Sequence, residues 1–329
     1  MKKQKSRIFI TGDTHCSIDI HKLNSKNFLT GCTLTKNDIV IICGDAGFVW
    51  SGDKEDQRWI NWIDRKPWTT VYVCGNHENF DLLKKYPIVD FHGAKAHQIS
   101  HSLYHILRGE IFEMNDETFF CFGGAFSHDR EYRVENISWW QDELPIQEEI
   151  DNAITNLNRY NNKVDYIITH DVPTEINISL GYTVANMNNY DKGKYIHICQ
   201  FLQNIFETVH YKVWFAGHYH INQLCKQHLQ ILYQDIVELK AVPEYYVTID
   251  NEINKIMSRS YSRFELLKLC QEDNLYMTSR KMDKKENFSQ YESIIKVEDF
   301  FQVEVNDKEL AALTYLYNKY IIKKQTDKE

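Results

Sequence analysis

Five short apolar segments, each ending at Asp, Asn or His, constrain the fold of this chain more than any other feature. Residues 39–45 read IVIICGD, a run of β-branched residues typical of a buried strand, and Asp45 ends the run. The other four segments are residues 7–13, 70–78, 164–170 and 213–220, and they lead to Asp13 and His15, Asn76 and His77, His170, and His218 and His220. Because ligands of open α/β sheets bind at the carboxyl ends of the strands, we predict that these side chains meet in a metal site.

The alternation of apolar and amphipathic stretches predicts an α/β domain over residues 1–250. Helices are expected at residues 56–63, 79–86, 147–160 and 194–209, and further strands at residues 118–122, 229–233 and 245–249. Residues 251–329 contain neither Gly nor Pro, and their charges are balanced. We expect them to form a small, mainly helical extension, either a cap on the core or an interaction element.

Charge and cysteine usage exclude several classes of protein. The formal net charge of −8 argues against holding nucleic acid by bulk charge, but a nuclease stays open because metal ions neutralise phosphates locally. None of the eight cysteines forms a Cys-x-x-Cys pair, which argues against a structural zinc site. The first apolar run is too short for a signal sequence or a membrane span, so we expect a reduced, cytoplasmic protein with no membrane partner.

One tetrahedral ion needs four ligands, and the ends of the five segments offer more than that even without His77. Carboxylate and imidazole groups together suit manganese, iron, zinc or cobalt. Two divalent ions about 3.5–4 Å apart would use the whole set, with one carboxylate shared between them. His218 and His220 would point oppositely in an extended strand, so they require a loop, which Gly217 permits.

Read in order, these blocks resemble the calcineurin-like metallophosphoesterase superfamily over about residues 7–220. The blocks that carry the resemblance are Asp13-x-His15, Gly44-Asp45, Gly75-Asn76-His77-Glu78, His170 and Gly217-His218-x-His220. The stretches GDAGFVW, GNHENFD, LRGEIFEM, GGAFSHDREYR and SWWQDELP resemble an uncharacterised bacterial and phage branch. The resemblance implies a four-layer α-β-β-α sandwich, with two facing mixed sheets and helices outside.

The resemblance also implies a role for each matched residue. Asp13, His15 and His220 would hold one ion; Asn76, His170 and His218 would hold the second; Asp45 would bridge them. Manganese is favoured among the metals. A hydroxide bridging the ions would attack phosphorus, and His77, with Asp45 the catalytic pair, would assist by protonating the leaving oxygen. Glu78 or another carboxylate would orient His77.

The substrate is left to weaker signals. His128, Arg130 and Arg133 follow a Gly-Gly-Ala loop, and they are either ligands of a substrate phosphate or members of a surface salt-bridge cluster. Trp50, Trp139 and Trp140 either line the pocket or pack in the core, the second being favoured. The remaining histidines outside the motifs, among them His97 and His105, are interpreted as ordinary.

Three activities and one inactive alternative follow. The favoured activity is hydrolysis of a phosphate ester of a nucleotide or another small phosphorylated molecule. A nuclease or phosphodiesterase acting on nucleic acid ranks second, because no Lys/Arg cluster lies near the motifs. A protein phosphatase ranks third, since the Asp-Arg-Gly that such enzymes carry after Gly-Asp is missing, and an inactive scaffold ranks last because every motif residue is present. Monoester and diester substrates, and the oligomeric state, stay open.

Overall fold

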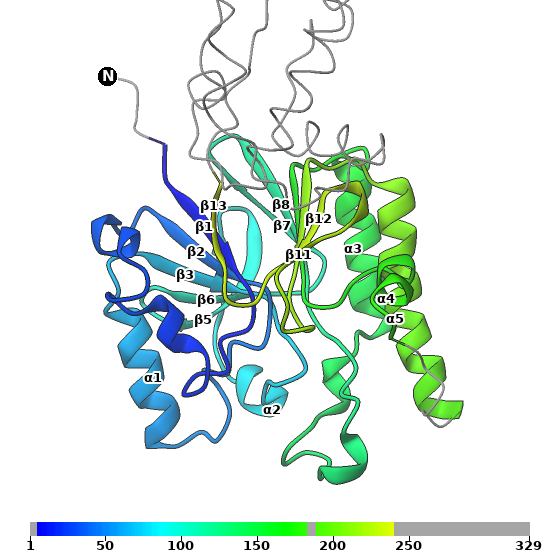
Figure 1. The fold of residues 1–329 in the computed structure, drawn as a ribbon, viewed down its shortest axis with the longest axis horizontal. Helices are drawn as coiled ribbons and strands as arrows, with labels where there is room; N and C mark the ends of the chain where they lie inside the picture. Colours follow the sequence, from blue (N-terminus) through cyan, green and yellow to red (C-terminus); the bar gives the residue numbers. More distant parts are fainter. Residues whose placement is uncertain (1–4, 183–188, 240–329) are drawn as a thin grey trace, which may run out of the picture. The chain divides into compact units, whose positions relative to one another are not determined.

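Two mixed β-sheets form the centre of the computed structural model, which describes residues 5–182 and 189–239 (Figure 1). The first sheet has the order β13 (Ile236–Leu239), β1 (Ile8–Thr11), β2 (Ile39–Ile42), β3 (Thr69–Tyr72), β6 (Leu103–Ile106), β5 (Ala94–Ser100) and β4 (Ile88–Phe91). The second has the order β11 (Gln223–Leu224), β12 (Leu229–Ile231), β10 (Val213–Ala216), β9 (Tyr166–Thr169), β8 (Glu117–Phe122) and β7 (Glu110–Met114).

Parallel pairing at the middle of each sheet aligns the strand ends. β1, β2, β3 and β6 run parallel to one another, as do β8, β9, β10 and β12. The antiparallel strands lie toward the edges of the sheets, where β13 pairs with β1 and β7 pairs with β8. In each sheet the carboxyl ends of the central strands therefore lie together at the same edge.

Helices cover the outer face of each sheet, as Figure 1 shows. α1 (Lys54–Asp64) packs against the first sheet, whereas α3 (Gln147–Arg159), α4 (Thr174–Ser179) and α5 (Asn189–Thr208) lie on the side of the second sheet; α2 (Phe80–Leu83) is a single turn after β3. Shorter 3₁₀ turns span Ile20–Leu23, Thr30–Thr33, Arg130–Tyr132, Gln141–Glu143 and Lys226–His228. The four-layer sandwich expected from the sequence is confirmed.

Successive side chains of a strand point to opposite faces of the sheet, and in the central strands the side chains on both faces are apolar. In β2, Val40 and Ile42 join the cluster that packs around Trp59 and Ile60 of α1, while Ile39 and Ile41 are equally buried on the other face. β8 to β10 repeat this pattern, with one face against α3 and α5. Each sheet is thus buried on both sides, which explains why its central strands read as continuous apolar runs.

The sequence-based element predictions hold best for these central strands. The helices expected at residues 56–63 and 147–160 are confirmed within two residues, but only one turn forms within residues 79–86. Strands β4 to β7, β11 and β13 were missed, because each of their segments mixes at least one of Asp, Glu, Lys, His or Gln with apolar residues. The strand expected at residues 245–249 and the helical extension of residues 251–329 lie outside the described residues. None of the helices in the described part of the chain has the length and apolar character needed to span a lipid bilayer.

Candidate metal centre

The predicted ligands meet at the carboxyl ends of five strands from both sheets. Asp13, Asp45 and Asn76 follow β1, β2 and β3, whereas His170 follows β9, and His218 and His220 follow β10. Ligand atoms within 4.8 Å of one another form three overlapping groups: Asp13, His15 and His220; His15, Asp45 and His77; and Asp45, His170 and His218. The fold therefore brings together side chains more than 200 positions apart in the sequence, such as Asp13 and His220.

Asp45 lies in the middle of this cluster. Its Oδ2 atom lies 3.2 Å from Nε2 of His15 and 3.3 Å from Nε2 of His170, and its Oδ1 accepts a hydrogen bond of 2.7 Å from the backbone N–H of His77. Burial favours a higher pKa for this carboxyl, but the imidazoles of His170 and His15 hold the pKa well below its usual range. One oxygen thus faces imidazoles from both sheets, which is where a shared carboxylate is needed.

Asp13, His15 and His220 are called the first half-site below. Nδ1 of His15 lies 2.8 Å from Oδ2 of Asp19, which keeps the proton on Nδ1 and leaves Nε2 facing the cluster. The side chain of His220 is 48% exposed and stacks on Tyr233, with ring centroids 4.7 Å apart. The Tyr233 hydroxyl donates to Oδ1 of Asp19 at 2.8 Å. Asp19 and Tyr233 therefore orient two of the three side chains.

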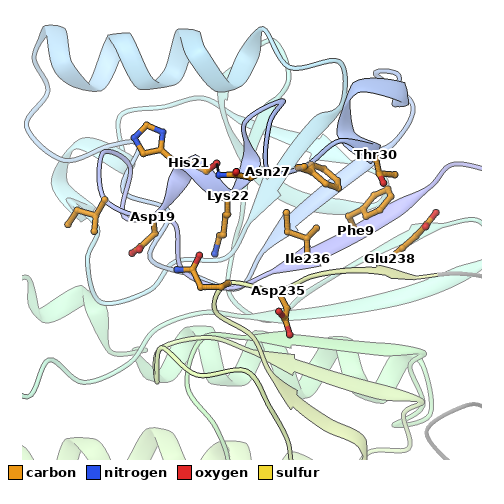
Figure 2. A pocket seen from close by; sticks show the side chains of 12 residues that line it. Phe9, Asp19, His21, Lys22, Asn27, Thr30, Asp235, Ile236 and Glu238 are labelled. Atoms are coloured by element: carbon orange, nitrogen blue, oxygen red, sulfur yellow. Dashed lines mark hydrogen bonds between the residues drawn. The ribbon is translucent and has the colours of Figure 1, made fainter. Parts of the chain in front are cut away.

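A cavity of about 650 Å³ opens beside Asp19 and Lys22, which contact residues of the first half-site (Figure 2). Asp19 and Lys22 lie at one end of it, and Glu238 lies toward the other. The Lys22 ammonium donates to the carbonyl oxygens of Gly12 and Asp13 at 2.9 and 2.7 Å. Burial lowers the pKa of Lys22 to about 8, although Asp13 and Asp19 favour its charge. The cavity thus borders the partners of His15 and of the Asp13 carbonyl group, but none of the three side chains of the first half-site lines it.

Asn76, His170 and His218 are called the second half-site, and its surroundings are more buried. Asn76 is 4% exposed and His170 is fully buried. Nδ1–H of His170 donates to the carbonyl oxygen of Cys43 at 2.7 Å, which leaves Nε2 facing the cluster. Oδ1 of Asn76 lies 3.2 Å from that Nε2, and its amide Nδ2 donates to Oγ of Ser127 at 3.0 Å. Protein atoms thus enclose Asn76 and His170, whereas His218 is half-buried.

The electrostatics of the cluster favour a cation. Burial lowers the pKa of His170, but Asp45 and Asp13 raise it by more, to about 10. Burial likewise lowers the pKa of His15, but the hydrogen bond and charge of Asp45 raise it to about 9. A centre that stabilises added protons this strongly also stabilises a metal cation in their place. The carboxylate, imidazole and amide donors fit a divalent transition metal ion.

Strained backbone accompanies the cluster. Four of its residues have φ in the left-handed region, namely His15 (37°), Asp45 (48°), His218 (69°) and His220 (51°). Each such residue costs roughly 1 kcal/mol, and such strain concentrates at functional sites. Glycines allow the close approach of the loops, because a Cβ on Gly44 would overlap His170 and a Cβ on Gly75 would overlap Asp45.

His77 lies against Arg133 at the edge of the cluster. Nη2 and Nη1 of Arg133 lie 3.2 and 3.4 Å from Nε2 and Nδ1 of His77. The guanidinium is anchored by Oδ2 of Asp129, at 2.8 Å, and by the carbonyl oxygen of Ser138, at 3.2 Å. Burial lowers the pKa of His77, Asp45 opposes this, and Arg133 lowers the pKa further. The neutral imidazole is therefore the favoured form.

The other two residues proposed for substrate binding have different surroundings. Nε of Arg130 donates to Oε1 of the fully buried Glu143 at 2.9 Å. The ring of His128 lies 5.8 Å from that of His218, with 30° between their planes. Arg133 thus contacts His77 and His128 faces His218, whereas Arg130 is paired with Glu143.

The structure also shows the surroundings of Glu78, Trp50 and Trp140, whose roles the sequence left open. Oε1 of Glu78 accepts a hydrogen bond from the backbone N–H of Ala46, so it is positioned on the loop of Asp45. Trp140 is 1% exposed and packs in a small cluster with the partly buried Trp50, whose ring lies 6.3 Å from that of His77. Core packing thus accounts for Trp140, while Trp50 also borders the site.

Sequence reasoning missed the partners that lie behind the ligands, namely Asp19, Lys22, Ser127, Glu143 and Tyr233. Asp19 follows His15 by four residues, and this spacing was the one local signal available. Ser127 and Glu143 lie in the quoted stretches GGAFSHDREYR and SWWQDELP, but nothing in those stretches assigned them a role. Lys22 and Tyr233 lie in no quoted stretch, and their contacts are made by the tertiary fold.

Comparison with known proteins agrees with this centre. A family model described as calcineurin-like phosphoesterase matches residues 6–222, which is more than half of the chain. No curated protein matches the sequence. The matched range begins just before β1 and ends just after His220, so it contains all of the clustered side chains.

Proposed function

Because the chain belongs to the calcineurin-like phosphoesterase family, whose members are metal-dependent hydrolases, we propose that its Asp/His centre hydrolyses a phosphate ester of a nucleotide or another small phosphorylated molecule. In this proposal Asp13, His15 and His220 hold one divalent ion, Asn76, His170 and His218 hold a second, and Asp45 is shared. Manganese is the favoured metal, with zinc, iron and cobalt as alternatives.

The position of Asp45 is the observation that carries the proposal. A single carboxylate oxygen lies within 3.3 Å of imidazole nitrogens from both half-sites. Bound divalent ions supply Lewis-acid polarisation of the phosphoryl group and activation of a water molecule. The chain itself supplies the orientation, because hydrogen bonds from Asp19 and Cys43 set which nitrogens of His15 and His170 face inward.

His77 and Arg133 act on the substrate in this proposal. His77, held beside Asp45 by its backbone N–H, donates a hydrogen bond from its neutral imidazole to the leaving oxygen. The Arg133 guanidinium, already anchored by Asp129, binds the non-bridging phosphoryl oxygens as a planar donor. Both groups stabilise the charge that develops on the phosphoryl group.

A small substrate is supported by how the neighbouring cations are used. Lys22 donates to backbone carbonyl oxygens, and Arg130 is paired with the buried Glu143. Neither therefore contributes to a basic track for a long polyanion. Arg133 instead offers one local contact of the size of a single phosphate.

The proposal is tested with the purified protein in Mn²⁺, using p-nitrophenyl phosphate, bis-p-nitrophenyl phosphate and single-stranded DNA. We expect turnover of at least one of the small esters, faster than cleavage of DNA, and complete loss of turnover after chelation. Cleavage of DNA with both small esters untouched would support a nuclease, and turnover that survives chelation would contradict a metal-dependent reaction.

Arg133 is tested separately by Arg133→Ala. Losing a charged hydrogen bond to the substrate should raise KM for the small ester by about tenfold. Arg58→Ala is the matched control, because Arg58 lies on α1 and pairs with Glu55 at the surface. An unchanged KM in Arg133→Ala would remove Arg133 from the substrate site.

A further inference from the structure

We propose that Ser127 and Glu143, supported by Arg130, are positioning residues that decide which end of the Asn76 amide faces the metal centre. The inference rests on the proposed function, because it takes Asn76 as a ligand of the second half-site. It assigns a new role to side chains in the loop after β8 and in the turn Gln141–Glu143, which lie in the quoted stretches GGAFSHDREYR and SWWQDELP.

An asparagine ligand has a problem that a carboxylate ligand does not have. Its side chain ends in an oxygen and an NH₂ group of similar size, and the oxygen alone has lone pairs for a cation. Asn76 is 4% exposed, so solvent does not determine which end faces inward. Its two ends meet different partners: Oδ1 lies 3.2 Å from Nε2 of His170, and Nδ2 lies 3.0 Å from Oγ of Ser127.

Ser127 is made an acceptor toward Asn76 by its other contacts. Its Oγ lies 2.8 Å from Oε2 of Glu143, and its backbone N–H donates to Oε1 of Glu143 at 2.9 Å. An ionised carboxylate accepts hydrogen bonds and donates none, so the single hydroxyl proton of Ser127 goes to Glu143. The remaining lone pairs of Ser127 face Asn76 and select the NH₂ end, which turns the amide oxygen toward the centre.

Arg130 pairs with Glu143 and so favours the ionised carboxylate that accepts the hydroxyl proton of Ser127. Glu143 is fully buried, and burial raises its pKa, whereas Arg130 and the donors of Ser127 oppose that rise. Nε of Arg130 donates to Oε1 of Glu143 at 2.9 Å, and the guanidinium lies over the rings of Phe126 and Trp139 at 4.2 and 4.3 Å. Arg130 is thus held rigidly as the counter-ion of Glu143.

The test compares Ser127→Ala with the wild type in Mn²⁺ titrations followed by calorimetry and by metal content per chain. Outer partners of metal ligands typically contribute a factor of 10–100 to metal affinity. We therefore expect the second ion to bind about 10–100-fold more weakly, while the first ion binds as in the wild type. Activity should return at saturating Mn²⁺. Ser138→Ala is the matched control, since Ser138 lies in the same loop and its Oγ accepts from the Val134 N–H.

A second background separates orientation from general damage to the fold. In Asn76→Asp both ends of the side chain are oxygens, so adding Ser127→Ala should change the affinity of the second ion by less than about threefold. An equal loss in both backgrounds would show a structural effect and overturn the inference. Glu143→Gln serves if Ser127→Ala does not fold, because a neutral amide no longer forces the direction of the Ser127 hydroxyl.

Unchanged affinity for the second ion in Ser127→Ala or Glu143→Gln would also overturn the inference. That result leaves the proposed function intact, provided that the wild type binds two ions and hydrolyses a phosphate ester. Failure of the wild type to bind metal would instead remove the proposed function.

Discussion

The two half-sites use similar donors but are supported in different ways. The first half-site is oriented by Asp19 and Tyr233, and its His220 is 48% exposed at the side chain. The second is oriented by Ser127 and the fully buried Glu143. Solvent can replace part of a lost contact at the first half-site, whereas a lost partner at the second leaves a buried polar group unpaired.

Asp45→Asn should have the largest effect, because it removes the carboxylate shared by both half-sites. We expect kcat/KM to fall by about 1,000-fold or more, with fewer than two ions retained per chain. Metal content and turnover of p-nitrophenyl phosphate measure this. Two bound ions and full activity in Asp45→Asn would contradict a carboxylate shared by the half-sites, which would then be independent of each other.

A pair of matched variants sharpens the comparison. Glu143→Gln should weaken the second ion by about 10–100-fold, whereas Asp19→Asn should weaken the first ion by less than about tenfold, since water can replace a lost partner of His15. Both variants neutralise one carboxylate without changing its volume. Competition titrations with a coloured chelator rank the affinities. Equal losses, or the reverse order, would show that burial does not separate the half-sites.

The two ions should also differ in how fast a chelator removes them. The ion of the first half-site should leave several-fold faster on chelation, because the side chain of His220 is 48% exposed. Stopped-flow mixing with excess chelator should show two phases. In Glu143→Gln the slow phase should accelerate, while the fast phase stays as in the wild type. A single phase in the wild type would argue that both ions share one exit step.

The smallest effect concerns acid stability outside the centre. His97 and His105 lie in β5 and β6 with Nδ1 atoms 3.1 Å apart, and burial lowers the pKa of both, most strongly at His105. Their native pKa values lie below the unfolded value of about 6.5, so the unfolded chain binds more protons as the pH falls, and stability is lost below about pH 6.5.

Metal-free wild type should therefore lose about 1 kcal/mol more unfolding free energy than His105→Gln between pH 6.5 and pH 5.5. Urea unfolding at the two pH values measures this. The metal-free form is needed so that the centre contributes equally in both proteins. An identical loss in His105→Gln would assign the acid sensitivity to other groups.

Much of the fold followed from local patterns. The apolar runs that became β1, β2, β3, β9 and β10 are buried on both faces, and this produces the continuous hydrophobic signal from which they were predicted. β4 and β5 carry alternating or mixed residues such as Lys95, His97 and Gln98, and they gave no clear period. They form strands because β6 and the rest of the sheet pair with them.

Arg130 and Arg133 show where local reasoning ends. They lie three residues apart in one loop, and the sequence treated them alike as candidates for substrate binding. In the structure one pairs with Glu143 and the other contacts His77. The role proposed for Arg133 stays a prediction, while the place of Arg130 beside Glu143 led to a different proposal.

The sequence by itself determined the family, the alternation of strands and helices, and the set of polar residues that end the strands. These features are local, because a run of apolar residues and the residue that stops it are neighbours in the chain. Only the tertiary structure decided which partners orient those residues. Tyr233 reaches Asp19 across 214 positions and Ser127 reaches Asn76 across 51, and contacts of that separation leave no periodic trace in the sequence.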